Sequence, residues 1–92
     1  MKTINKFTFK NLSDYLKHFR YLPTYRKGNK DAFYNPRNRQ DLLIPIDKPE
    51  FTKLEVITLF SNSKATDMPP NIEWCRFQQY IYSIDNNPNQ FH

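Results

Sequence analysis

The chain has 92 residues, of which 38% are hydrophobic and 16% aromatic, and its formal net charge is +5. A chain of this length has room for one small domain, whose core must be built largely from aromatic side chains. A single cysteine excludes an internal disulfide, and the longest apolar runs are too short to span a bilayer, so we expect a cytoplasmic protein with no membrane segment.

The charge is divided unevenly along the chain. Residues 1–40 hold ten Lys and Arg against two acids, a net +8, whereas residues 41–92 hold four against seven, a net −3. Because a clustered field attracts opposite charge, this asymmetry predicts that the first half faces an anionic partner.

The first elements are predicted from a change of hydrophobic period. Phe7 and Phe9 alternate with polar residues, which predicts a strand over residues 3–10. From Asn11 onward, apolar residues recur at spacings of three and four until Pro23 ends the run. This pattern predicts a helix over residues 12–21 with Asn11 as its N-cap.

The middle of the chain is predicted to be a loop followed by two strands. Residues 23–41 show no hydrophobic period and contain Gly28 and Pro36, which predicts a long loop. Residues 42–46 and 52–60 are predicted as strands. Pro45 places the first of these at a sheet edge, and the second, apolar on both faces, is expected at the sheet centre.

Residues 72–84 fit either a helix or a strand, and the prolines just before them, with Glu73 in the first turn, favour a helix. The predicted order is therefore strand, helix, loop, strand, strand, helix. It defines a small α+β domain over residues 1–86, with about three strands, one or two helices and a basic loop over 23–41, followed by a polar tail over 87–92.

Several kinds of chemistry lack the residues they need. The chain has two histidines, without zinc-site spacing, and its single glycine, Gly28, excludes the glycine-rich phosphate and dinucleotide loops. Cys75 lies among aromatic residues and is expected to be a buried, inert thiol. We therefore predict no catalytic residue, no metal and no cofactor.

Residues 25–40 carry five cations and three aromatic side chains against one acid. Cations neutralise phosphates and aromatic rings stack on bases, a combination that binds single-stranded nucleic acid without a sequence code. Arg37 and Arg39 would share one side of an extended segment, and the preceding helix would extend the same basic surface. The candidate binding residues are Lys17, Arg20, Tyr25, Arg26, Lys27, Lys30, Tyr34, Arg37 and Arg39. A plainer interpretation is a solvated connection pinned to the core by Phe33 and Tyr34.

Three functions fit these features. The first is a small non-enzymatic binding protein whose basic half contacts nucleic acid or a nucleoprotein complex. The second is an inhibitor of the kind that phages and mobile elements encode, such as anti-CRISPR proteins, which binds and blocks a host protein or nucleoprotein machine. The third is a small metal-independent ribonuclease toxin, for which no residue can be singled out.

Overall fold

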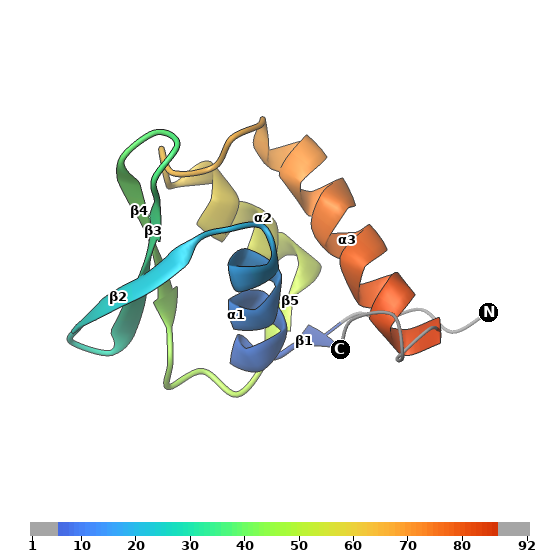
Figure 1. Ribbon diagram of the computed structural model, residues 1–92. Coiled ribbons are helices and arrows are strands. Elements are labelled where there is room, and N and C mark those ends of the chain that lie inside the picture. The colour runs from blue at the N-terminus through green and yellow to red at the C-terminus, as the bar shows by residue number, and fades with distance from the viewer. Residues whose placement is uncertain (1–5, 87–92) are drawn as a thin grey trace.

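Two antiparallel sheets and three helices make up residues 6–86, the part of the chain that the computed structural model describes. One sheet pairs β1 (Lys6–Phe7) with β5 (Phe51–Thr52), and the other has the order β2 (Leu22–Lys27), β3 (Lys30–Asn35), β4 (Gln40–Pro45). The helices are α1 (Phe9–His18), α2 (Lys53–Ser61) and α3 (Pro70–Asn86). The three-stranded sheet lies on one side of the molecule and α3 on the other, with α1 and α2 between them (Figure 1). The predicted α+β class is confirmed.

The predicted first helix exists but begins earlier than expected. Thr8, rather than Asn11, is the N-cap of α1, and the two residues form a reciprocal capping box with distances of 3.1 and 2.8 Å. At the other end the Tyr21 N–H donates to the Leu16 carbonyl at 2.8 Å, and Arg20 takes the left-handed position with φ 69°. This is a Schellman motif in which Arg20 occupies the position that glycine usually fills.

The expected first strand is much shorter than predicted. Within the predicted range of residues 3–10, β1 contains only Lys6 and Phe7, Phe9 already belongs to α1, and residues 3–5 lie outside the described part of the chain. The predicted polar tail over residues 87–92 also lies outside it.

The prediction of a central strand over residues 52–60 is wrong, because these residues form α2. Thr52 caps the helix by accepting the Glu55 N–H at 3.2 Å, and the Glu55 side chain accepts the Thr52 N–H at 2.9 Å. Val56 and Phe60, one helical turn apart, are both fully buried. The β-branched composition suggested a strand, but the capping box and the helical spacing of the buried residues decide the outcome.

The prediction of a loop over residues 23–41 is also wrong. Most of this segment forms a hairpin of β2 and β3 followed by the start of β4. Gly28, with φ 61°, and Asn29 make the two-residue turn between Lys27 and Lys30, which needs a left-handed first residue. β3 is the central strand, and β4 lies at an edge as Pro45 predicted.

The core is dominated by aromatic side chains. Phe77 of α3 is fully buried and packs edge-on against Phe7 and Tyr15, with ring centroids 5.1 Å apart in each case. Residues 72–84 are helical, as the preceding prolines favoured. Within residues 6–86 no helix combines the length and the apolar character needed to cross a bilayer.

Candidate nucleic-acid interface

The three-stranded sheet has an inner face that packs on the helices and an outer face that does not. Phe33, Leu42 and Ile44 point inward and are buried in the core. Side chains alternate along a strand and directly paired residues share a face, so the neighbours of these residues point outward. The outer sheet face therefore comprises Leu22, Tyr25, Lys27, Lys30, Ala32, Tyr34, Asp41, Leu43 and Pro45.

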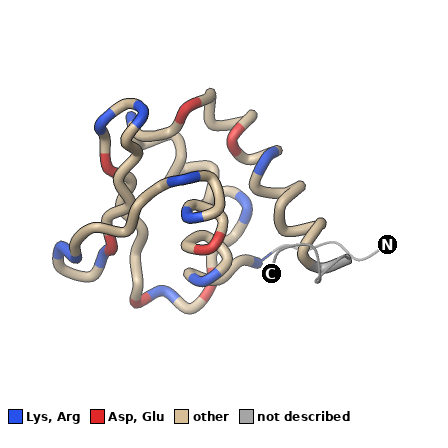
Figure 2. The backbone as a smooth tube through the Cα atoms, in the orientation of Figure 1, with Lys and Arg blue, Asp and Glu red and all other residues tan. Residues whose placement is uncertain are grey.

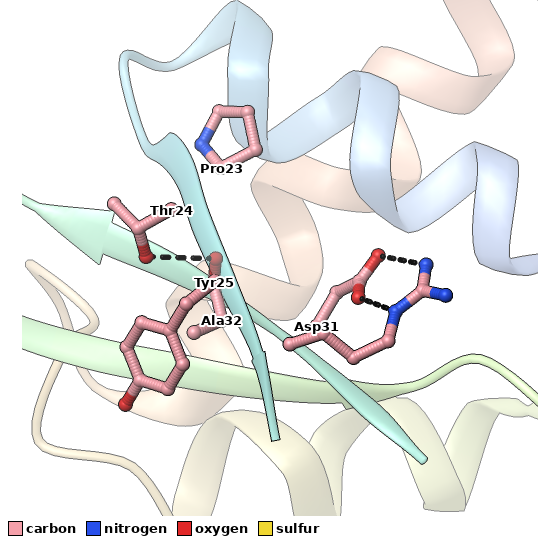
Figure 3. A pocket seen from close by; sticks show the side chains of 6 residues that line it. Pro23, Thr24, Tyr25, Asp31 and Ala32 are labelled. Atoms are coloured by element: carbon pink, nitrogen blue, oxygen red, sulfur yellow. Dashed lines mark hydrogen bonds and ion pairs between the residues drawn. The ribbon is translucent and has the colours of Figure 1, made fainter. Parts of the chain in front are cut away.

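A β-bulge shapes the edge strand of this face. Pro23 pairs with Phe33 and Arg26 pairs with Asp31, so Thr24 and Tyr25 together oppose Ala32. The Thr24 hydroxyl donates to the Ala32 carbonyl at 3.2 Å beside a hollow of about 420 Å³. Figure 3 shows the Tyr25 ring on one side of β2 and Asp31 on the other.

Tyr25 is held on the outer sheet face by an acid of β4. Its hydroxyl donates to Asp41 Oδ2 at 3.1 Å, and this bond raises the pKa of Tyr25. The ring remains 50% exposed. Tyr34, which pairs directly with Asp41, is half-buried on the same face. Two aromatic rings thus flank one carboxylate.

Lys27 and Lys30 face each other across the turn of the hairpin. Both are exposed, and among the described residues neither forms an ion pair with a carboxylate. Like charges placed directly opposite in an antiparallel pair repel each other and destabilise it. The turn itself is fixed, because the Ile46 N–H donates to the Asn29 carbonyl at 2.8 Å and the Asn29 side chain donates to Asp47 at 3.0 Å.

The other predicted cations lie elsewhere. Arg26 points to the inner side of the sheet and binds both carboxylate oxygens of Asp31, at 2.7 and 3.3 Å. These hydrogen bonds lower the pKa of the Asp31 carboxyl. Lys17 lies on α1, 4.0 Å from Asp14, and Arg20 follows the end of that helix. None of these three residues belongs to the outer sheet face.

Arg37 lies beyond the opposite end of β3, roughly 20 Å from the hairpin turn, where its side chain holds neighbouring segments together. Its Nε donates to Asp67 at 2.9 Å, another guanidinium nitrogen donates to the Phe19 carbonyl at 3.0 Å, and the group lies over the Tyr21 ring. Residues 36–39 form a turn in which Arg39 has φ 62°, so the expectation of an extended segment with Arg37 and Arg39 on one side is wrong.

The nine predicted residues therefore do not form one basic surface. Figure 2 shows Lys and Arg at both ends of the three-stranded sheet and along α1. Four of the nine lie together on the outer sheet face: Tyr25, Lys27, Lys30 and Tyr34. Phe33, one of the three aromatic residues counted in residues 25–40, is buried in the core, as the plainer interpretation expected.

A buried polar cluster between α1 and α3 was not predicted from the sequence. Glu73 is fully buried, and its Oε2 accepts hydrogen bonds from the Tyr15 hydroxyl and, at 2.7 Å, from Arg76. Arg76 Nε also donates to the Tyr15 oxygen at 2.8 Å. Burial, followed by the bond to Glu73, raises the pKa of the Tyr15 hydroxyl. The long sequence separation of Tyr15 from the other two left no local signal, and Tyr15 and Glu73 are closed to any substrate.

Cys75 is exposed, which corrects the expectation of a buried thiol. Trp74, Phe77 and Ile81 form the buried stripe of α3, and position 75 lies off that stripe. His18 is exposed and contacts the rings of Phe19 and Tyr80. Within residues 6–86 no three His, Cys, Asp or Glu side chains are grouped to hold a metal ion.

Comparisons with protein families, with curated proteins and with solved structures found no match to this chain.

Proposed function

We propose that this protein is a non-enzymatic binding protein that holds single-stranded nucleic acid on the outer sheet face. The observation that carries the proposal is the pair Lys27 and Lys30, opposed and without carboxylate partners among the described residues, on the same face as the exposed ring of Tyr25. The helices pack on the other side of this sheet (Figure 1).

The two lysines favour an anion at the hairpin turn. In the free protein their charges repel each other, and a phosphate bound between them adds two attractions that offset this repulsion. Contact with two phosphates also releases the counterions condensed on the nucleic acid, which makes binding dependent on salt. The charge pattern of this turn therefore suits the phosphodiester backbone of a nucleic acid.

The tyrosines favour unpaired bases. Stacking of a base on an aromatic side chain contributes about 1–3 kcal/mol. Tyr25 presents half of its surface to solvent, and Tyr34 lies across Asp41 from it. Bases inside a duplex are already stacked on one another, so only a single strand, a loop or an open end offers faces to these rings.

The direct test is fluorescence anisotropy with a labelled oligonucleotide of about ten nucleotides, within the usual site size of such surfaces. Replacing Lys27 and Lys30 by Gln should reduce the slope of log K against log salt by about 1.4, because each phosphate contact on a single strand contributes about 0.7. The matched control replaces Arg39 and Lys53 by Gln. Both side chains are exposed, form no ion pair among the described residues and lie outside the outer sheet face, so the same charge is removed elsewhere. The proposal would be refuted if both double variants reduce the salt slope equally, or if the wild-type protein does not bind the oligonucleotide at low salt.

Stacking is tested separately at Tyr25. Tyr25→Leu should weaken binding by about 1–3 kcal/mol, whereas Tyr25→Phe, which keeps the ring, should bind nearly as well as the wild type. If both substitutions weaken binding equally, the hydroxyl rather than the ring is responsible.

Two outcomes of the same experiments would favour the other functions. Cleavage of the oligonucleotide during incubation would favour the ribonuclease toxin. The inhibitor would be favoured if the protein binds no oligonucleotide and instead captures one protein partner in a pull-down that survives nuclease treatment. Lys27→Gln and Lys30→Gln should then abolish that capture. In that case the exposed edge strand β2 offers a backbone for strand addition.

A further inference from the structure

Asp41 is the one acidic residue on the outer sheet face, and the proposed binding of phosphates does not explain why an acid lies there. It is exposed and pairs directly with Tyr34, and its Oδ2 accepts the hydroxyl of Tyr25 at 3.1 Å. A carboxylate repels phosphate, so an acid on a nucleic-acid surface lowers affinity unless it recognises something other than the backbone.

We propose that Asp41 makes this surface selective for guanine, an inference that rests on the proposed binding of single-stranded nucleic acid. The hydroxyl of Tyr25 orients the carboxylate between the two rings on which bases stack. Among the described residues no side chain bonds to Oδ1, and each carboxylate oxygen can accept two hydrogen bonds. The carboxylate therefore keeps free acceptors beside the rings on which bases would stack.

Guanine fits these acceptors better than the other bases do. Its Watson–Crick edge carries a ring N–H beside an amino group, two adjacent donors that match the two oxygens of a carboxylate. Adenine and cytosine each offer one amino group beside an unprotonated ring nitrogen, which repels the second oxygen. Uracil and thymine offer one N–H between two carbonyl oxygens, and both carbonyls repel the carboxylate.

The test compares oligouridylates of about ten nucleotides that differ only in one central base. The oligonucleotide with guanine should bind the wild-type protein about five- to tenfold more tightly than the all-uridine one, the lower end of the range for a bidentate base contact. In Asp41→Asn this ratio should fall to about one, while the affinity for the all-uridine strand stays the same or rises because a repelling charge is lost.

Two control variants separate base recognition from other roles of Asp41. Asp47→Asn removes the same charge near the hairpin turn and should leave the guanine preference intact. Tyr25→Phe removes the hydroxyl that orients the carboxylate but leaves both Asp41 oxygens as acceptors, so it should lower the guanine preference without abolishing it. If Asp41 only holds Tyr25 in place, Asp41→Asn will weaken all the oligonucleotides equally and the ratio will not change.

The proposed function and the proposed guanine preference would be refuted by different results. No detectable binding of any oligonucleotide overturns the proposed function itself. Binding without a preference for guanine, or with a preference that survives in Asp41→Asn, overturns only this inference.

Discussion

Substitution of Tyr15 tests whether the cluster of Tyr15, Glu73 and Arg76 holds α1 and α3 together. Tyr15 and Glu73 are both 0% exposed, and Glu73 Oε1 has no hydrogen-bond partner among the described residues. Tyr15→Phe removes one of the two donors to Oε2 and also the acceptor for Arg76 Nε. Since a buried carboxylate depends on its remaining donors, we expect the free energy of unfolding to fall by about 1.5–3 kcal/mol.

This loss is a large fraction of the roughly 5–14 kcal/mol that a domain of this size has in total. Urea unfolding can be followed through Trp74, the single tryptophan, which is 6% exposed between Phe7 and Phe77. With a denaturant slope of about 1–3 kcal/mol/M, the midpoint should fall by about 1 M.

The control for this prediction is Tyr25→Phe, which removes a hydroxyl from an exposed tyrosine and should change stability by less than about 0.5 kcal/mol. In a Glu73→Gln background the cost of Tyr15→Phe should shrink to about 0.5–1.5 kcal/mol, the range for a hydrogen bond between neutral groups. An unchanged or higher midpoint in Tyr15→Phe would show that the cluster does not stabilise the fold.

Four further outcomes are expected. Thr52→Ala should lower the free energy of unfolding in urea by about 1 kcal/mol, because α2 loses its N-cap, whereas Thr52→Ser should retain most of it. Arg20→Gly should raise the melting temperature, since glycine relieves a left-handed backbone at a cost of about 1 kcal/mol for other residues; a lower melting temperature would mean that the Arg20 side chain stabilises the fold. Arg37→Ala should destabilise the protein yet leave the salt slope of oligonucleotide binding unchanged, because Asp67 already holds its charge. Burial, followed by the charge of Glu73, raises the pKa of Tyr21 to about 12, so the unfolded chain loses this proton first. The contribution of Tyr21 to the free energy of unfolding should be fully present below about pH 10 and should be lost as the pH rises to about 12. The free energy of unfolding should therefore fall less steeply with pH in Tyr21→Phe. Equal slopes in the two proteins would contradict this.

The sequence was informative for α1 and α3, two helices that each bury a stripe of side chains. The spacing of Leu12, Tyr15, Leu16 and Phe19 predicted α1, and the prolines before residue 71 predicted the start of α3. The main error in the predicted elements was α2. Val56 and Ile57 have high β propensity and favoured a strand, although Thr52 and Glu55 match the sequence pattern of a capping box. A local hydrogen-bonding signal was present and outweighed the composition.

The hairpin was missed for a different reason. All six residues of β2 are exposed, so no buried side chain imposes a period of two on its sequence. The only local signal is the pair Gly28–Asn29, a dipeptide that suits a two-residue turn. The strand is held by its pairing to β3, and such nonlocal pairing leaves little trace in a single sequence.

The site was only partly predictable, because register rather than composition decides which residues share the outer sheet face. The bulge at Thr24 places Leu22 and Tyr25, three positions apart, on the same side of β2, while Arg26 points to the other side. A count of cations along the sequence therefore does not distinguish Arg26 from Lys27. In the fold Arg26 is paired with Asp31, whereas Lys27 faces Lys30. Charge counts thus identify the half of the chain that carries the excess of cations, and only strand pairing identifies the charges that a partner can still reach.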